Sequence, residues 1–171
     1  MKKSTKGLNK SIELFRDLEN NNIKHCHWKS NQHLKEAIDG LTDIDLLVDK
    51  EELQRIELVL IQLGYKRILS QAWVTYPGIE DWLGFDDDNG NLIHIHLHYQ
   101  IVTGKKYVKD QALPYEKYIL KNTIKDINFN VNIVEPNLEF ILLIMRIALK
   151  SEYLKILQNK VIRNKLFPQN I

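Results

Sequence analysis

Residues 92–99 limit the possible folds of this chain more than any other stretch, because isoleucine and leucine alternate there with histidine. A period of two is typical of a β-strand whose apolar face packs on a core. The same period places all three histidines of the run on the opposite face. The turn residues 88–90, Asp-Asn-Gly, come just before, so residues 73–99 predict antiparallel strands that include a hairpin.

The other hydrophobic patterns predict a mixed α/β fold. Apolar residues three and four positions apart predict helices at residues 5–21, 31–38, 50–63 and 136–148, the last of them buried. Short apolar runs predict strands at residues 23–28, 44–48, 65–69 and 127–134. This order is typical of an α/β (α+β) domain in which helices flank a mixed β-sheet. We expect one domain at residues 1–135 and a C-terminal helical segment, residues 136–171, packed on it.

Charge and composition exclude several classes of partner. The 24 basic and 22 acidic residues leave a net charge of +2, which gives no basic track for nucleic acid. No run approaches the roughly 18 apolar residues that cross a membrane, and the first residues lack the apolar stretch of a secretory signal. Cys26 is the only cysteine, so an internal disulfide and a cysteine zinc cluster are excluded. We therefore expect a cytoplasmic protein with no nucleic-acid and no membrane partner.

Asp43 and Asp45 are the strongest chemical signal. They lie two residues apart at the start of the strand predicted at residues 44–48, hence on one face of it. Carboxylates that close raise each other's pKa unless a cation neutralises them. Oxygen ligands favour Mg²⁺, which shares its shell with phosphates and water, so the pair suits phosphoryl or nucleotidyl transfer. The structural alternative is that Asp43 begins the strand and Asp45 faces solvent.

Residues 28–30, Trp-Lys-Ser, and the acid-x-acid strand at residues 42–48 resemble the signature of the polymerase-beta-type nucleotidyltransferase superfamily. With residues 27–31 and 94–99, the chain is similar to an uncharacterised bacterial branch of that superfamily, whose members occur near polysaccharide-biosynthesis functions. The resemblance covers roughly residues 12–146. It implies a nucleotidyltransferase-like domain in which Asp43 and Asp45 are catalytic metal ligands and Ser30 helps to hold the triphosphate.

Two departures from that signature bear on the site. Lys29 stands where the superfamily has glycine; its amine would bind phosphate directly, unless it is an exposed loop lysine. His94 and His96 lie on the strand where many members carry a third carboxylate. Either would then ligate the metal, Mg²⁺ or Mn²⁺, or a transition metal, since imidazole favours Zn²⁺, Mn²⁺ or Fe²⁺. His96 is also a candidate general base for an acceptor hydroxyl.

The remaining histidines have a plainer alternative. His98 shares the face of the other two, and all three are compatible with packing or hydrogen bonding on a half-buried face. His25 and His27 repeat the alternation on another predicted strand. If that strand neighbours the acid pair, a metal site drawing on both strands is possible.

Weaker signals lie elsewhere in the chain. Arg146 falls inside an apolar helix, where an unpaired guanidinium is costly, so it pairs either with an acid or with a nucleotide. The acidic residues 86–88 indicate a hairpin turn, with calcium binding as the alternative. The aromatic residues Trp73, Tyr76 and Trp82 would form either core or the floor of a base or sugar pocket.

These features together favour a metal-dependent enzyme that moves a nucleoside monophosphate from an NTP to a small-molecule or sugar acceptor. One alternative is a catalytically inactive nucleotide-binding or regulatory module of the same fold. Another is a metal-dependent phosphohydrolase built on the histidines.

Overall fold

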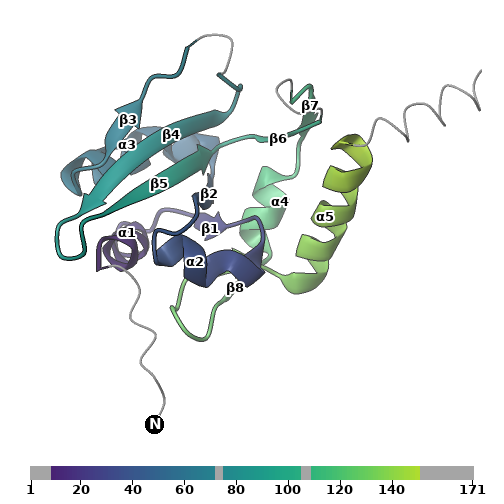
Figure 1. Cartoon of the computed structure of the whole chain (residues 1–171). Helices are drawn as coiled ribbons and strands as arrows, with labels where there is room; N and C mark the ends of the chain where they lie inside the picture. The colour runs from purple at the N-terminus through teal and green to yellow at the C-terminus, as the bar shows by residue number, and fades with distance from the viewer. Residues whose placement is uncertain (1–8, 72–74, 105–108, 151–171) are drawn as a thin grey trace, which may run out of the picture.

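The computed structural model describes residues 9–71, 75–104 and 109–150, and Figure 1 shows their arrangement. The helices are α1 (Asn9–Asn20), α2 (Leu34–Ile38), α3 (Leu53–Gln62), α4 (Glu116–Lys121) and α5 (Pro136–Lys150), with 3-10 turns η1 (Asn31–His33) and η2 (Lys50–Glu52) before α2 and α3. The strands are β1 (His25–His27), β2 (Ile44–Val48), β3 (Lys66–Ile68), β4 (Ile79–Asp86), β5 (Asn91–His98), β6 (Ile101–Thr103), β7 (Gln111–Leu113), β8 (Thr123–Lys125) and β9 (Asn132–Val134).

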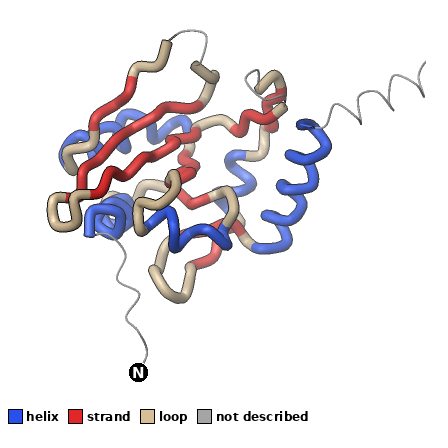
Figure 2. Tube along the Cα trace, in the orientation of Figure 1, coloured by secondary structure: helices blue, strands red, loops and turns tan. Residues whose placement is uncertain are grey.

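Seven strands form one mixed sheet in the order β3-β4-β5-β2-β1-β9-β8. β2 pairs in parallel with β5 and β1 in parallel with β9, and the other neighbours are antiparallel. β6 and β7 form a separate two-stranded sheet. Figure 2 shows the long β4–β5 hairpin as the largest continuous part of the sheet. The expected mixed sheet flanked by helices is confirmed.

The two faces of the sheet pack against different helices. On one face α1 and α3 bury the apolar side chains of β2, β4 and β5, including Ile44, Leu46 and Ile95. On the other face α4 and α5 close a smaller core over β1, β2 and β9, which includes Trp28 and Leu47. Among the described residues, this smaller core takes no member from β4 or β5. The histidine-bearing face of β5 therefore lies beside the helix-covered region.

Two predicted elements differ from the structure. Residues 127–131 were expected to begin a strand, but the strand begins at Asn132, and residues 127–129 form a turn in which Asp126 Oδ1 accepts hydrogen bonds from the backbone N–H groups of Asn128 and Phe129. Such side-chain bonds compete with strand pairing. α5 was expected to be buried, yet among its apolar residues only Leu142 is buried, while Phe140, Ile141, Leu143, Ile144 and Ile147 are exposed. Apolar composition alone does not reveal whether a covering element exists.

The structure also places some of the weaker sequence signals, namely the acidic turn and two of the three aromatic residues. Asp86 closes the hairpin turn by accepting hydrogen bonds from Asn89, which agrees with the turn interpretation. Trp82 is buried in the main core, whereas Tyr76 lines a hollow described below. Trp73 and the tail from residue 151 onward lie outside the described residues. Among the described helices, none has the length and apolar character required to cross a bilayer.

Gly84 in β4 gives a test of the main core. A Cβ atom at this position would lie 2.4 Å from a ring carbon of Tyr65, which is buried. Since overpacking a well-filled core costs about 1–3 kcal/mol, Gly84→Ala should lower the free energy of unfolding by that amount in urea denaturation. The neighbouring control Phe85→Ala removes a side chain that is 48% exposed and should change stability by no more than about 0.5 kcal/mol. Equal stability of Gly84→Ala and the wild type would contradict the close contact.

Candidate metal-binding site

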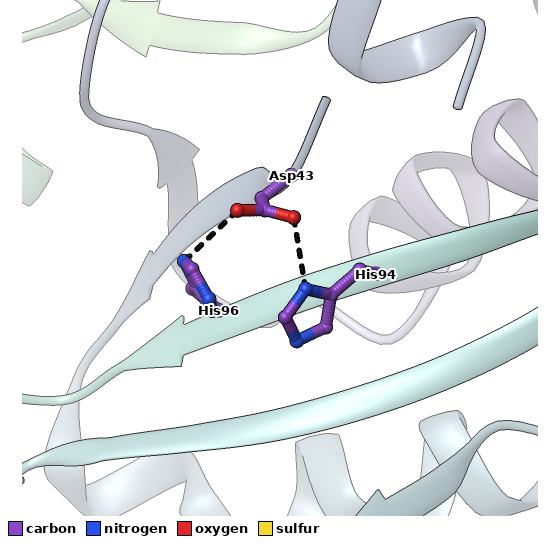
Figure 3. A group of neighbouring side chains, drawn as sticks. All are labelled: Asp43, His94 and His96. Atoms are coloured by element: carbon purple, nitrogen blue, oxygen red, sulfur yellow. Dashed lines mark hydrogen bonds and ion pairs between the residues drawn. The ribbon is translucent and has the colours of Figure 1, made fainter. Parts of the chain in front are cut away.

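The parallel pairing of β2 with β5 brings the predicted acids and histidines together. Asp45 is the register partner of His96, and Ile44 of Ile95. The isoleucines point into the main core, so the acids and histidines share the opposite face. Asp43, just before β2, joins them on this face, as Figure 3 shows.

The side chains of this group, which we call the Asp/His cluster, lie close enough together to hold a metal ion; they are Asp43, Asp45, His94, His96 and His98. His94 Nδ1 is 2.8 Å from Asp43 Oδ1. His96 Nδ1 is 3.7 Å from Asp43 Oδ2 and 3.6 Å from Asp45 Oδ1. Two sets of potential ligand atoms each fall within 4.8 Å of one another: Asp43 with His94 and His96, and Asp45 with His96 and His98. His96 belongs to both sets.

Asp81 of β4 is a third carboxylate, which sequence reasoning missed. Its Oδ1 lies 3.3 Å from His94 Nε2 and 3.3 Å from His96 Nε2. The signal was present in the hairpin: Asp86 pairs with Asn91 across the turn, and counting back along both strands sets Asp81 opposite His96. Histidines of β5 therefore lie between the acids at β2 and the acid of β4.

Lys29 and His98 surround Asp45 from the helix-covered side. Lys29 Nζ donates to Asp45 Oδ1 at 2.5 Å, and its side chain is only 16% exposed, so the alternative of an exposed loop lysine is wrong. His98 Nε2 lies 3.0 Å from the same oxygen. Burial lowers the pKa of His98 to about 3, which keeps its ring neutral.

Asp45 stays ionised despite its burial. Burial alone would raise the pKa of Asp45, but the contacts with His96 and His98 and the charge of Lys29 hold that pKa well below its usual range. Burial lowers the pKa of Lys29 to about 8, while Asp45 opposes the shift. The two side chains therefore form a charged pair near neutral pH.

Ser30 lies at the rim of a hollow between β1, η1 and α5, which we call the α5 hollow. Its φ of 53° falls in the left-handed region, a conformation that favours glycine. The adjacent residue anchors the loop: Asn31 N donates to Glu139 Oε1 at 2.6 Å and Asn31 Nδ2 donates to the Val134 carbonyl at 2.9 Å. The α5 hollow has a volume of about 190 Å³, and its wall includes Trp28, Ser30 and Arg146.

Arg146 lines this hollow and has no acidic partner in contact among the described residues. Its guanidinium carbon is 5.7 Å from the Trp28 ring. Asp45 and Glu139 act on it electrostatically, but within the described part of the chain no carboxylate forms an ion pair with it at 4 Å or less. Of the two roles expected for Arg146, the structural ion pair is therefore absent from the described residues, and its charge faces the hollow.

The idea of a metal site shared with β1 is wrong. β1 does pair with β2, but His25 is the register partner of Val48 and His27 of Leu46, whose side chains point into the main core. Both histidines are buried. They therefore lie on the face of the sheet opposite Asp45.

The donor set of the Asp/His cluster fits a metal ion. A neutral imidazole carries one N–H, so the rings of His94 and His96 cannot donate from both nitrogens to the carboxylates that flank them. His94 Nε2 is buried and has no hydrogen-bond partner among the described residues, although Asp81 Oδ1 lies nearby. A divalent cation would satisfy such a surplus of acceptor atoms. The cluster can accordingly hold a metal ion.

No protein-family model, curated protein or solved structure matches this chain.

His27 predicts how stability depends on pH. Burial lowers its pKa to about 4 in the folded protein, whereas the unfolded chain titrates near the ordinary value of about 6.5. The unfolded state therefore binds more protons between these values, and stability must fall as the pH drops from about 6.5 to about 4. His27→Gln should reduce this slope by roughly 1 kcal/mol per pH unit, measured by urea unfolding at several pH values. His33→Gln, which changes a ring that is 57% exposed, should leave the slope unchanged; equal slopes for both variants would contradict the assignment.

Proposed function

We propose that this protein is a metal-dependent nucleotidyltransferase that moves a nucleoside monophosphate from an NTP to a small-molecule or sugar acceptor. The observation that carries the proposal is the carboxylate pair Asp43 and Asp45, which lies beside histidine ligands and near a hollow containing Arg146. Carboxylates that hold a metal ion through one or two ligands leave the rest of its shell to phosphate oxygens. The similarity of residues 28–30 and 42–48 to the superfamily signature supports the same assignment.

The triphosphate binds along the loop that follows β1. Arg146 offers its guanidinium for bidentate contact with phosphate oxygens, and Ser30 offers a hydroxyl at the rim of the same hollow. Lys29 currently neutralises Asp45. With a cation held by Asp45, the ammonium of Lys29 would be free to bind phosphate.

The reaction is an in-line displacement at the α-phosphorus. Asp43, Asp45 and a histidine would hold a divalent cation, and this cation would supply charge neutralisation for the attacking and leaving oxygens. The acceptor hydroxyl oxygen bonds to the α-phosphorus while the bond from that phosphorus to pyrophosphate breaks, and pyrophosphate leaves with the electron pair. His96 accepts the hydroxyl proton. The protein contributes mainly positioning and charge neutralisation.

A second candidate function is hydrolysis of a phosphate ester at a transition metal. The observation that favours it is that His94 and His96 each place a ring nitrogen within 4.8 Å of an Asp43 carboxylate oxygen. Imidazole suits Zn²⁺, Mn²⁺ or Fe²⁺, whereas Mg²⁺ prefers oxygen ligands. Water would then replace the acceptor hydroxyl, and inorganic phosphate would be the product.

Nucleotide binding should depend on both the metal and the acid pair. An NTP at about 100 times its dissociation constant adds roughly 2.7 kcal/mol to stability, which thermal-shift titration with Mg²⁺ or Mn²⁺ detects. The double variant Asp43→Asn/Asp45→Asn should lose this metal-dependent shift. Asp87→Asn, an exposed carboxylate in the hairpin turn, is the matched control and should retain it. A folded wild type that shows no shift with any NTP would overturn nucleotide binding at this site.

The released product distinguishes the two candidate functions. Nucleotidyl transfer should release pyrophosphate from an NTP, with Mg²⁺ or Mn²⁺ and only when an acceptor is present. Hydrolysis should release inorganic phosphate from a phosphate ester with a transition metal and no acceptor. Ion chromatography measures both anions, and Asp43→Asn/Asp45→Asn should lower either by at least about 100-fold, since it removes ligands of the catalytic ion. Nucleotide-dependent stabilisation with neither product would favour the inactive binding module.

A further inference from the structure

A second hollow opens on the other side of the Asp/His cluster. It has a volume of about 270 Å³ and lies where the connection between β3 and β4 approaches β5. We call it the β3–β4 hollow. His96 belongs both to its wall and to the cluster, and Asp81 of the same wall lies 3.3 Å from His96 Nε2. A ligand in this hollow would therefore touch the same histidine that contacts Asp43 and Asp45.

The β3–β4 hollow and the α5 hollow lie on opposite sides of the cluster along the sheet. The sheet runs β3-β4-β5-β2-β1-β9, with the cluster on β5 and β2. The β3–β4 hollow lies toward β3 and β4, and the α5 hollow lies beyond β1. An in-line displacement needs the attacking and leaving oxygens on opposite sides of the phosphorus. If the triphosphate occupies the α5 side, the acceptor enters from the β3–β4 hollow.

Two of the charged groups that line this hollow, Arg67 and Glu80, are paired with each other. Arg67 donates to Glu80 Oε1 at 2.8 Å and lies 3.7 Å from Glu57. The other carboxylate oxygen of Glu80 accepts a hydrogen bond from Trp82 Nε1. Asp81 contacts the two histidines of the cluster. The charges of Arg67 and Glu80 are therefore paired within the protein, whereas Asp81 faces the histidines of the cluster.

Lys109 also lines this hollow, but it has no carboxylate in contact among the described residues. Its Nζ lies 4.0 Å from the centroid of the Tyr76 ring, and both residues line the hollow. In the described ranges, no carboxylate oxygen comes within 4 Å of this ammonium; Asp45 and Asp81 attract it from a greater distance. A divalent cation held by the cluster would weaken this attraction and leave the ammonium available to an anion in the hollow.

Size and apolar lining limit the ligand further. The volume lies just below the roughly 300–1,000 Å³ of pockets that enclose drug-sized ligands, so the hollow suits a small molecule. Ile68 and Ile79 provide an apolar surface for a short carbon chain. His96 is placed to meet a hydroxyl at the cluster end, while Lys109 meets the charged end.

We propose that the β3–β4 hollow binds the acceptor, and that this acceptor is a small alcohol carrying one anionic group, which Lys109 recognises. The assignment as an acceptor site rests on the proposed nucleotidyl transfer. The binding of an anionic alcohol there does not, because it is measured without nucleotide.

The test compares glycerol 3-phosphate with uncharged glycerol by isothermal titration calorimetry on the full chain, with Mn²⁺ and without NTP. The wild type should bind glycerol 3-phosphate, and glycerol should bind at least about tenfold more weakly, as expected for one lost charge-assisted hydrogen bond. Lys109→Gln should weaken glycerol 3-phosphate by a similar factor and leave glycerol unchanged. Lys117→Gln, which alters an ammonium 71% exposed and paired with Glu51, should bind like the wild type. Matching melting temperatures establish that the variants are folded.

Three outcomes would overturn the proposal: no binding of glycerol 3-phosphate, equal binding of both compounds, or wild-type affinity in Lys109→Gln. Arg146→Gln tests which hollow binds the anion. If this variant alone lost binding of glycerol 3-phosphate, the anion would bind in the α5 hollow. If glycerol 3-phosphate binds as expected but the protein releases no pyrophosphate from an NTP, nucleotidyl transfer is refuted and the anion site is retained. Pyrophosphate release with glycerol as good an acceptor as its phosphate would refute the anion site alone.

Discussion

The parallel register between β2 and β5 is the constraint on which the site depends. Ile44 pairs with Ile95 and Leu46 with Leu97, and all four side chains are buried in the main core. A slip of one residue would turn these side chains outward and bury the acids and histidines. The free energy of apolar burial on one face therefore fixes the distances between ligand atoms on the other. The packing of the core thus determines the register that brings the acids and histidines together.

Packing of Trp28 on His98 also helps to position the side chains at the helix-covered end of the polar face. Trp28 is buried by α4 and α5, and its ring meets the ring of His98 edge-on at 5.1 Å. Asp45 therefore lies at the boundary between a dry core and a wet face. Asp43, which is 43% exposed, lies on the open side of the same boundary. Asp45 in the strand and Asp43 just before it thus lie in very different surroundings.

Local periodicity predicted those parts of the site that lie within one strand or one hairpin. The alternation in β5 placed His94 and His96 on one face, and the spacing of Asp43 and Asp45 placed the acids on one face of β2. Asp81 was also predictable, because the hairpin turn fixes its register partner. The pairing of β2 with β5 was not, since parallel neighbours are joined by long crossovers and their order follows from packing of the whole sheet. For the same reason, sequence alone did not reveal that Lys29 pairs with Asp45 or that α5 leaves much of its apolar surface open.

The contact between Lys29 and Asp45 has a thermodynamic consequence. In the absence of a metal, the ammonium acts as an internal counterion, so a divalent cation must compete with it for the carboxylate. An anion that draws Lys29 away lowers this competition and strengthens cation binding, and by reciprocity a bound cation strengthens the binding of that anion. Through the side chain of Lys29, a cation and an anion would thus each favour the binding of the other.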